Sequence, residues 1–481
     1  MQSSILSAPH APEFVARPAR LAGRPQRLVV VSSRADPCAG LHEDASTRTI
    51  RDALAEHGGV WLGWSGRVDD ARMFHVRREG RIRCVAGDLS AEEHRLGYAG
   101  YAARTLWPLL HGRLDLVAFD REWLRGYRQI NERFADSVAR LTEPGDLVWI
   151  HDHHLIPLGR ALRDRGIDAA IGFFLHAPVP PPETLAALPE HARLFPLLEA
   201  CDVVGVQTAG DARHLKDYLQ SRVARMPRIE VCPAGIDVAA ATALAEEAAA
   251  RPRADAPRLL IGVDRLDGIS GLPLRLQAFR RLLEAEPALR GETAYLQIAQ
   301  RGGATDEDRR VEDEVQTLAE HINGRYAEPA WTPIRCVTRR MRHSEIIALL
   351  RKAKVGVVTP LRDGMSPVAQ AYVAAQDPDD PGALVLSEFS GAAGALRGAL
   401  LVNPYDVDGC AQALREALAM PLEERRERWA DMMRALRRDD VFAWRDRFLA
   451  SLAGPQQPPA WRDAPMRARG LPLRADAAER A

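Results

Sequence analysis

Eight short runs of hydrophobic residues recur along this chain in two sets of four. The first, Arg27–Ser33, is an unbroken β-branched run followed by small polar residues, which is typical of a strand buried on both faces. Helix-forming stretches separate the runs, and this alternation predicts an α/β fold with two parallel, doubly wound sheets. The runs are 27–33, 146–151, 170–176 and 203–207, then 258–263, 294–299, 355–359 and 383–387.

The spacing of the two sets divides the chain into four segments. Residues 1–26 are rich in Arg and Pro and are expected to be a disordered N-terminal arm. Residues 27–250 form one Rossmann-like domain, and residues 258–452 form a second, separated from it by a Pro/Arg/Ala stretch. The last helix of the second domain is expected to return to the first. Residues 453–481 are expected to be a disordered tail.

Charge excludes several classes of partner. The chain has 65 basic and 65 acidic residues, so it has no net field that would attract nucleic acid or an anionic membrane. Small molecules are therefore the expected partners, and homo-oligomerisation is left open. Only three of the basic residues are lysines, so a basic position that drifts neutrally in this chain is expected to become arginine.

The six cysteines are scattered, with neither a CxxC pair nor the spacing of a metal site. In a chain of this length they indicate reduced thiols. No apolar run reaches the ~18 residues of a membrane span. The N-terminal segment lacks the apolar region of a secretory signal, so the expected location is the cytoplasm.

Parallel α/β sheets bind ligands outside the carboxyl ends of their strands, so two such sheets predict a ligand cleft between them. Polar residues follow most of the predicted strands at this edge. They are Ser33, Arg34, His151–His154, His176, Gln207, Asp264, Arg265, Arg301, Arg362 and Asp363.

Three interpretations of His151-Asp152-His153-His154 stay open. Three histidines and an aspartate suggest a metal site, but adjacent residues leaving a strand point in different directions and no HxxxH spacing is present. The second interpretation is that His151 and His153 pack structurally. The third is that Asp152 accepts hydrogen bonds from a substrate or orients a catalytic group. No metal or other cofactor is expected.

Other strand ends point to a sugar phosphate or nucleotide. His176 precedes a proline-rich loop that would fix its position as a substrate contact, although a histidine that only caps the strand is the simpler reading. After the strand 258–263, Asp264–Pro273 is a glycine-rich turn into a helix, which offers backbone N–H groups to a phosphate beside Arg265.

Several motifs together resemble the trehalose-6-phosphate synthase family. They are Trp61-Leu-Gly-Trp-Ser-Gly66, Trp149-Ile-His-Asp-His-His-Leu155, Ile171-Gly-Phe-Phe-Leu-His-Ala-Pro178, Val355-Gly-Val-Val-Thr-Pro-Leu-Arg-Asp-Gly-Met365, Ala371-Tyr-Val-Ala-Ala-Gln376 and Leu401-Val-Asn-Pro-Tyr-Asp406. The matches are collinear from about Arg27 to Leu452. The resemblance implies a GT-B fold with a deep cleft between an acceptor domain and a nucleotide-sugar domain. It also implies a retaining transfer of glucose from UDP-glucose to glucose 6-phosphate without a metal ion.

The resemblance assigns roles residue by residue. The acceptor and its phosphate fall to Arg34, Tyr98, Trp107 and Arg301, although Ser33 replaces the family's Asn and the loop after Arg301 differs in length. Asp152 is placed on the acceptor and His176 on the donor sugar. Donor binding falls to Arg265, Gly271, Asp363, Gly364 and Met365, and catalysis to Asp152, His176, Arg265 and Asp363.

The donor side departs from the family pattern at three places. Asp44 and Ala45 stand where the family has two glycines, and Ser270 stands where it has a lysine. Ala371 replaces the glutamate that holds the ribose, with Ser366 and Gln370 at flanking positions. If nothing compensates, losing the lysine and the glutamate costs roughly 10³-fold in transition-state binding. Arg275 is the nearest basic residue that could compensate.

Three functions therefore stay open. The first is α,α-trehalose-phosphate synthase. The second is a catalytically impaired sugar-phosphate-binding or regulatory paralog, and the third is a related glycosyltransferase with a different nucleotide-sugar donor.

Overall fold

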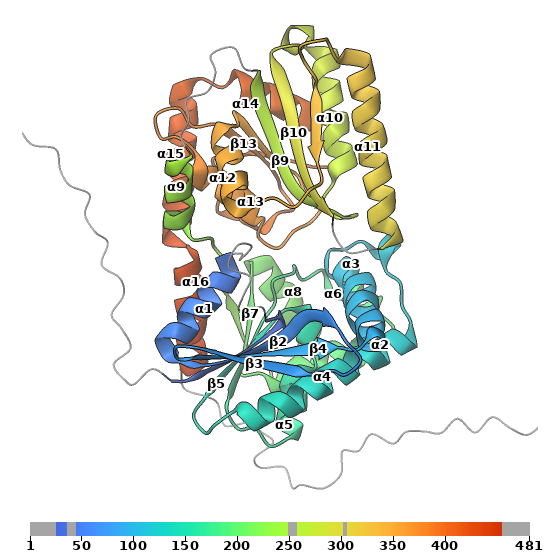
Figure 1. Cartoon of the computed structure of the whole chain (residues 1–481), viewed down its shortest axis with the longest axis vertical. Coiled ribbons are helices and arrows are strands. Elements are labelled where there is room, and N and C mark those ends of the chain that lie inside the picture. The colour runs from blue at the N-terminus through green and yellow to red at the C-terminus, as the bar shows by residue number, and fades with distance from the viewer. Residues whose placement is uncertain (1–25, 36–44, 249–256, 302–304, 455–481) are drawn as a thin grey trace, which may run out of the picture.

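The computed structural model describes residues 26–35, 45–248, 257–301 and 305–454. They form two α/β domains, one above the other in Figure 1, each built on a sheet with helices on both sides. The expected terminal arm and tail therefore lie almost wholly outside the described residues. Among the residues described, no helix is long and apolar enough to cross a membrane.

The N-terminal sheet has eight strands in the order β3-β4-β2-β1-β5-β6-β7-β8. All neighbours are parallel except β3 and β4, which form an antiparallel hairpin at one edge. The charged strand β3 is largely exposed, as a solvent-facing edge strand can be. The strands are β1 (Leu28–Arg34), β2 (Gly59–Val68), β3 (Phe74–Glu79), β4 (Ile82–Leu89), β5 (Leu147–His151), β6 (Ala170–Phe174), β7 (Val203–Val206) and β8 (Arg228–Val231).

The helices of this domain connect consecutive strands. They are α1 (Ala45–His57), α2 (Ala91–Glu93), the π-helix η1 (His94–Leu106), α3 (Trp107–Leu110), η2 (Leu114–Leu116), α4 (Arg121–Leu141), η3 (His153–Leu155), α5 (Leu158–Asp164), α6 (Pro182–Ala186), α7 (His191–Leu194), η4 (Phe195–Ala200) and α8 (Ala209–Leu219).

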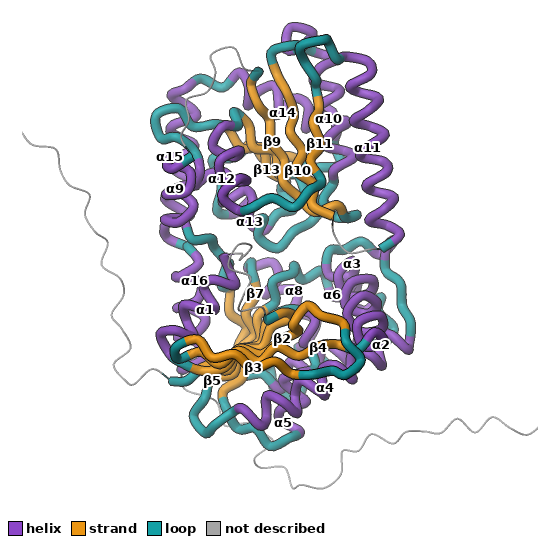
Figure 2. The backbone as a smooth tube through the Cα atoms, viewed as in Figure 1, coloured by secondary structure: helices purple, strands orange, loops and turns teal. Residues whose placement is uncertain are grey.

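The C-terminal sheet has six strands in the order β11-β10-β9-β12-β13-β14, and all of its pairs are parallel. Figure 2 shows the two sets of strands as separate bodies, with loops from both sheets facing each other between them. The strands are β9 (Arg258–Leu266), β10 (Thr293–Arg301), β11 (Ile334–Val337), β12 (Val355–Val358), β13 (Ala383–Ser387) and β14 (Leu400–Val402). The helices are α9 (Val238–Glu247), α10 (Leu272–Ala285), η5 (Pro287–Leu289), α11 (Asp306–Tyr326), α12 (His343–Lys352), α13 (Pro367–Ala375), η6 (Gly391–Gly394), α14 (Val407–Ala419), α15 (Leu422–Arg438) and α16 (Val441–Ala453).

Helix α9 packs with the C-terminal domain, whereas the expected boundary at residue 250 assigned it to the N-terminal one. Its buried residues Val238, Ala241 and Ala245 belong to the same hydrophobic cluster as α12 and α13. The hydroxyl of Thr242 also donates to the carbonyl oxygen of Ala374 at 3.1 Å. The boundary falls earlier because the apolar face of α9 packs on helices α12 and α13 of the second domain.

Helix α16 crosses back and packs on the N-terminal sheet (Figure 1). The ring of Trp444 lies 5.3 Å from that of Trp149 on β5, and Phe448 stacks on Trp149 at the same distance. Gly172 and Gly205 make room for this helix, because a Cβ at either position would lie 2.8 Å from the Phe448 ring. Helix α16 therefore joins the second domain to the first.

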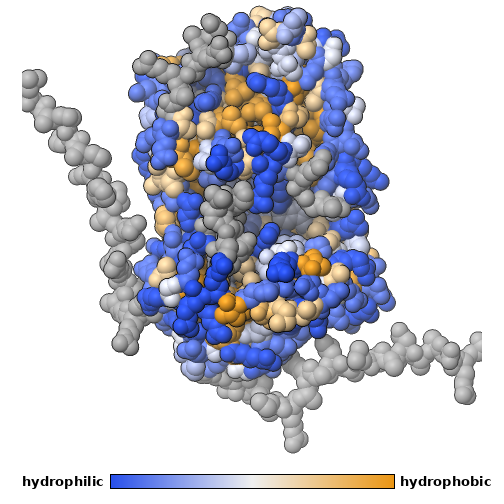
Figure 3. All heavy atoms as spheres, in the orientation of Figure 1, coloured by the Kyte–Doolittle hydropathy of each residue, from blue (hydrophilic) through white to orange (hydrophobic). Residues whose placement is uncertain are grey.

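The face of the molecule in Figure 3 is mostly hydrophilic, with hydrophobic residues gathered in the upper, C-terminal half. The two sheets instead bury their Val, Ile and Leu residues in separate cores. Each sheet is stabilised by its own core, so the residues at the carboxyl ends of its strands need not be apolar and can carry polar side chains.

Candidate active site

The acceptor-side residues cluster where β1 ends. The guanidinium carbon of Arg34, the last residue of β1, lies 5.9 Å from the Trp64 ring centroid. The Tyr98 ring lies 4.6 Å from Trp64 and 4.9 Å from His154. An arginine and a phenol beside aromatic rings provide charge for an anion and a flat apolar surface for a sugar ring.

The π-helix η1 positions Tyr98 on this wall. Burial is the largest influence on Tyr98 and raises the pKa of its phenol, whereas Arg34 and a hydrogen bond with Ser33 act in the opposite direction. The phenol therefore stays protonated and can donate a hydrogen bond. Arg34 and Tyr98 share one local electrostatic environment, as expected for two groups that meet one ligand.

Asp152 follows β5 with a positive φ of 74°. Burial alone would raise the pKa of its carboxyl group, but the neighbouring His153, His176 and His154 hold that pKa well below its ordinary value. The carboxylate is thus ionised and can accept hydrogen bonds from hydroxyl groups. The Asp152 Oδ1 atom lies 3.1 Å from Nδ1 of His153.

Asp152, His153 and His154 each place one ligand atom within 4.8 Å of the others. The expectation that these side chains diverge as they leave the strand is therefore wrong. The positive φ of Asp152 and the 3₁₀ turn η3 fold the segment back on itself. The three side chains are therefore close enough together to share one metal ion.

His176 lies just beyond β6 and contacts a second histidine. Its Nε2 atom is 3.2 Å from Nδ1 of His151, and the two rings stack with centroids 5.5 Å apart. Burial, followed by the effect of His176, lowers the pKa of His151 well below its ordinary value. A neutral His151 therefore fixes the orientation of the His176 ring through one hydrogen bond.

Arg265 and Trp107 meet where the two domains face each other. Trp107 begins α3 in the N-terminal domain, and Arg265 lies near the end of β9 in the C-terminal domain. The guanidinium carbon of Arg265 lies 4.5 Å from the centroid of the Trp107 ring, and one of its nitrogens lies 3.1 Å from a carboxylate oxygen of Asp267. The cation predicted for a phosphate therefore stacks on the aromatic residue predicted for the acceptor.

The glycine-rich turn after Arg265 leaves the start of helix α10 without a side-chain cap. The side chain of Ser270 in the same turn is hydrogen-bonded within the turn. Gly271, with φ at 67°, precedes α10 and provides no side-chain cap, so the N–H group of Leu272 remains available to a ligand, whereas Pro273 has no N–H to offer. Ser270 is buried, and its hydroxyl lies 2.6 Å from the Asp267 carboxylate and 2.8 Å from the Arg265 carbonyl oxygen. Ser270 thus folds inward, away from a diphosphate.

Arg275 does not replace the missing lysine. It is buried and forms an ion pair with Asp264, with an Nη2–Oδ1 distance of 3.1 Å. Its Nε group donates to the Thr359 hydroxyl at 2.9 Å. Because all of these partners lie within the C-terminal core, the guanidinium supports the strand ends and does not face a substrate.

Gly364, which follows Asp363, and the backbone of His176 approach each other from opposite domains. A Cβ at Gly364 would lie 2.2 Å from the carbonyl oxygen of His176, so only glycine permits this approach. The Asp363 carboxylate accepts from the Gly364 N–H at 2.8 Å and from the Ser366 hydroxyl at 2.6 Å. Burial is the largest influence and raises the Asp363 pKa. Met365, next along, is buried.

Three further positions complete the set. Arg301 ends β10, but its side chain lies outside the described residues, as do Asp44 and the side chain of Ala45. Ala371 is buried on α13. Its neighbour Gln370 donates from Nε2 to the carbonyl oxygen of Ala234 at 3.3 Å.

Two arginines that sequence reasoning left without a role join the domains. Arg113 donates from Nη1 to the carbonyl oxygen of Gly268, and Arg362 donates from Nη2 to that of Val179 at 3.1 Å. The position of Arg362 after a predicted strand was the one sequence feature that could have indicated a role for it. Arg113 gave no signal because its partner is a backbone oxygen 155 residues away.

The model of glycosyltransferase family 20 matches residues 36–454. The chain belongs to glycosyltransferase family 20. A trehalose-6-phosphate synthase from Sinorhizobium fredii is 40% identical over an alignment of 459 positions, which covers 89% of this chain and 98% of that protein. The GT-B fold and the glycosyltransferase class expected from the sequence are thereby confirmed.

Two solved structures in the family resemble this fold. A UDP-forming α,α-trehalose-phosphate synthase from Burkholderia xenovorans, in complex with glucose 6-phosphate, is 39% identical with a TM-score of 0.85, over 89% of this chain and all of that one. An E. coli family member bound with UDP-2-fluoro glucose is 37% identical with the same TM-score, over 89% of this chain and 99% of that one. One of these relatives thus binds a sugar phosphate, and the other binds an analogue of a nucleotide sugar.

Proposed function

We propose that this chain transfers glucose from UDP-glucose to glucose 6-phosphate with retention, and so forms α,α-trehalose 6-phosphate and UDP. The observation that carries this proposal is the contact of Arg265 with Trp107, 4.5 Å across the cleft. It joins the donor-side cation to the acceptor-side aromatic wall at one place. The small-molecule complexes of the two relatives support the same substrates.

The acceptor half of the site would bind glucose 6-phosphate. Arg34 and the Tyr98 hydroxyl would hold the phosphate, and Arg301 would complete its charge balance. Asp152, ionised beside three histidines, would accept hydrogen bonds from sugar hydroxyls. Trp107 would cover the apolar face of the ring.

The donor half would stabilise the leaving nucleotide. Arg265 and the uncapped N-terminus of α10 after Gly271 would face the diphosphate as its charge develops. Asp363, Gly364 and Met365 would hold the donor glucose, with His176 on the opposite side. A diphosphate oxygen leaving on the face that the acceptor approaches would take the proton of the acceptor hydroxyl, which preserves the configuration. No step requires a metal ion or another cofactor.

A different nucleotide-sugar donor is the second candidate function, and it has a specific observation in its favour. Ser270 is hydrogen-bonded within its own turn and Ala371 is buried and apolar, so two charged donor contacts are replaced without a substitute among the described residues of this turn and helix. The loss of a ribose contact would relax selection for one nucleoside.

Calorimetric titration separates these functions. Under our proposal, glucose 6-phosphate and UDP-glucose both bind, and their mixture yields UDP and a nonreducing disaccharide phosphate detected by NMR. Turnover with GDP-glucose in place of UDP-glucose would establish the second candidate. Binding of glucose 6-phosphate with no turnover on any nucleotide sugar would identify a non-catalytic sugar-phosphate-binding protein.

We place this activity in the cytoplasm. The five cysteines within the described residues, Cys84, Cys201, Cys232, Cys336 and Cys410, are all free thiols, which suits a reducing compartment. Cys38 lies outside the described residues.

A further inference from the structure

A groove of about 930 Å³ lies on the N-terminal domain, away from the residues of the candidate active site. Helix α4 forms its floor, and residues near α2 and α7 line its sides. Its charged lining consists of Arg72, Glu92, Glu93, Arg121, Arg125, Arg128, Glu132, Arg133, Asp136, Glu190 and Arg193. Its size suits a small ligand.

The sequence of α4 explains why arginines line this groove. Its apolar residues Leu124, Tyr127, Ile130 and Phe134 recur at helical spacing and are buried in the N-terminal core. The opposite face therefore turns to solvent. It carries three arginines and one glutamate, Glu122, in its first two turns, and acidic and basic residues alternate farther along. Asp120 caps the helix by accepting from the N–H groups of Glu122 and Trp123.

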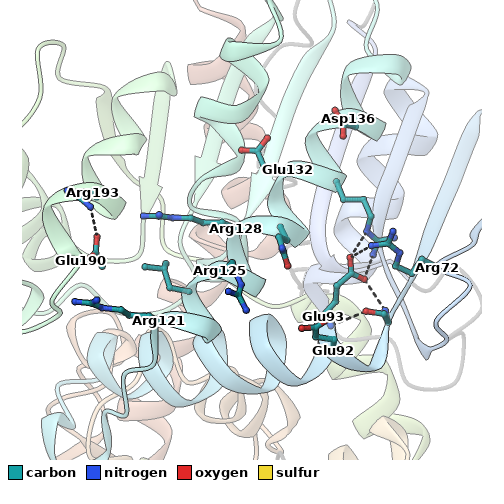
Figure 4. A pocket seen from close by; sticks show the side chains of 14 residues that line it. Arg72, Glu92, Glu93, Arg121, Arg125, Arg128, Glu132, Asp136, Glu190 and Arg193 are labelled. Atoms are coloured by element: carbon teal, nitrogen blue, oxygen red, sulfur yellow. Dashed lines mark hydrogen bonds and ion pairs between the residues drawn. The ribbon is translucent and has the colours of Figure 1, made fainter. Parts of the chain in front are cut away.

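The acidic residues at one end of the groove are already neutralised. Glu132 and Asp136 both pair with Arg165, at 2.9 and 2.8 Å. Glu93 pairs with Arg133 at 3.2 Å and with Arg72 at 3.3 Å. This end of the groove is thus a closed ion-pair network, which Figure 4 shows around Glu93.

The other end keeps positive charge without partners. Within the described part of the chain, Arg121 and Arg128 form no ion pair, and both extend toward the side where Glu190 and Arg193 lie (Figure 4). Arg193 meets Glu190 only at 3.7 Å, and Arg125 reaches Glu122 at 3.3 Å. Because Glu122 and Glu190 offset Arg125 and Arg193, the positive charge left without a partner at this end is that of Arg121 and Arg128.

A buried hydroxyl lies close to the same end. The side chain of Tyr101 is fully buried, and its hydroxyl has no hydrogen-bond partner among the described residues. The charged groups that act on it are Arg128 and Glu190, both of which line the groove.

We propose that this groove is a second ligand site, which binds a small molecule carrying at least two phosphate groups. Arg121 and Arg128 are seven residues apart, which separates them by about 10 Å along the helix axis. That spacing matches two phosphates on one small molecule, each with its own guanidinium. Arginine binds phosphate oxygens in a bidentate manner, which single surface charges do not achieve.

The test uses inorganic tripolyphosphate as the probe and calorimetry as the readout. Because the candidate active site would also bind this probe, the titration is made in an Arg34→Gln/Arg265→Gln background. We expect one tripolyphosphate per chain there. Adding Arg121→Gln and Arg128→Gln should weaken binding at least tenfold, and the corresponding lysine variants should weaken it less. Arg140→Gln, an exposed arginine at the end of α4 outside the groove, should change it less than twofold.

Two results would overturn the proposal. One is an absence of binding in the Arg34→Gln/Arg265→Gln background, and the other is binding that Arg121→Gln/Arg128→Gln leaves unchanged. Sedimentation of the same variants completes the experiment, because a loss of self-association without a change in tripolyphosphate affinity would identify an interface between two copies instead. Each variant is compared in thermal unfolding. Since no turnover is measured, the outcome is independent of the proposed transferase activity.

Discussion

The guanidinium carbon of Arg265 lies 4.5 Å from the centre of the Trp107 ring, although the two residues belong to different domains. Arg265 is 56% exposed and is held at one side by Asp267. A cation over an indole ring contributes about 0.5–2 kcal/mol, depending on how dry the site is. The stacking therefore helps to hold the domains together and keeps the arginine where a diphosphate would bind.

Substitutions of Trp107 should show whether its aromatic ring, and not only its size, is needed to contact the sugar and to support Arg265. We expect Trp107→Leu to lower kcat/KM at least tenfold, a loss of about 1.4 kcal/mol, because the sugar loses its aromatic wall and Arg265 loses its support. Trp107→Phe should retain most of the activity. Steady-state kinetics with both substrates measures this, and Trp123→Leu on α4 serves as a control. Equal losses in the Leu and Phe variants would contradict the aromatic role.

Arg34 should govern the affinity for the acceptor alone. Arg34→Gln removes a charged hydrogen-bond donor worth about 1.5–3 kcal/mol, so the KM for glucose 6-phosphate should rise roughly 10- to 100-fold. The KM for the nucleotide sugar should stay within about twofold. Arg67→Gln, an exposed arginine on β2, is the matched control. A rise in the nucleotide-sugar KM instead would move Arg34 to the other half of the site.

Chelation should leave the activity unchanged. Asp152, His153 and His154 lie close enough to share an ion, but in our mechanism Arg265 and the α10 N-terminus supply the positive charge. Activity measured after dialysis against EDTA should remain within about twofold of the untreated enzyme. A loss that Mg²⁺ or Zn²⁺ restores would show that these three residues bind a functional metal.

The stability of the protein should fall in mild acid through buried histidines. Burial is the main cause that lowers the pKa of His111 to about 3, whereas an unfolded histidine titrates near 6.5. Between these values the unfolded chain binds more protons, so the free energy of unfolding decreases as the pH falls below about 6.5. From pH 6.5 to pH 5, His111 alone contributes up to about 2 kcal/mol of this decrease.

Denaturant unfolding of wild type and His111→Gln at pH 7 and pH 5 tests this contribution. The variant should show the smaller change between the two pH values, because it cannot take up that proton on unfolding. A residual change is expected from His154, whose pKa burial also lowers to about 3. His321→Gln, at an exposed position of α11, should behave as the wild type. Identical pH responses in His111→Gln and wild type would refute the assignment.

The sequence predicts the fold better than the details of the site. Strand β13 was expected at residues 383–387 and lies there, because an unbroken apolar run of that length fits only a fully buried strand. The hairpin strand β3 was missed because its charged residues face solvent. The π-helix η1, which carries Tyr98, has no distinctive sequence pattern.

The neighbours of individual side chains could not be predicted from the sequence, for a physical reason. Arg275 and Arg265 are both arginines near one glycine-rich turn, yet one is buried in an ion pair and the other faces Trp107. The environment of each arginine is set by one neighbour, Asp264 for Arg275 and Trp107 for Arg265, and only the folded chain brings these neighbours close. The local sequence does not show which of two similar residues will have such a neighbour. In the same way, the sequence shows a glycine at position 364 after a predicted strand, but not its close approach to His176.

The last prediction concerns Ser270 and Ala371 together. If the altered donor positions limit activity, Ser270→Lys with Ala371→Glu should tighten UDP-glucose binding by about tenfold or more, as two charged contacts return. Lysine at 270 would break the serine's contacts with Asp267 and the Arg265 carbonyl and place an ammonium beside the diphosphate. Glutamate at the buried position 371 should destabilise the protein without ligand, because an unpaired charge is costly to bury.

Calorimetry measures the affinity of the double variant for UDP-glucose, and thermal unfolding with and without UDP-glucose measures its stability. We expect the double variant to unfold at a lower temperature than wild type when free and to gain more stability when UDP-glucose is added, because the ribose hydroxyls then satisfy the new carboxylate. Tighter binding of UDP-glucose would locate the limitation in these two positions. No gain beside an active wild type would mean that the pocket serves another donor. No gain beside an inactive wild type would direct attention to Asp44 and Ala45, and to a role in binding sugar phosphate without transfer.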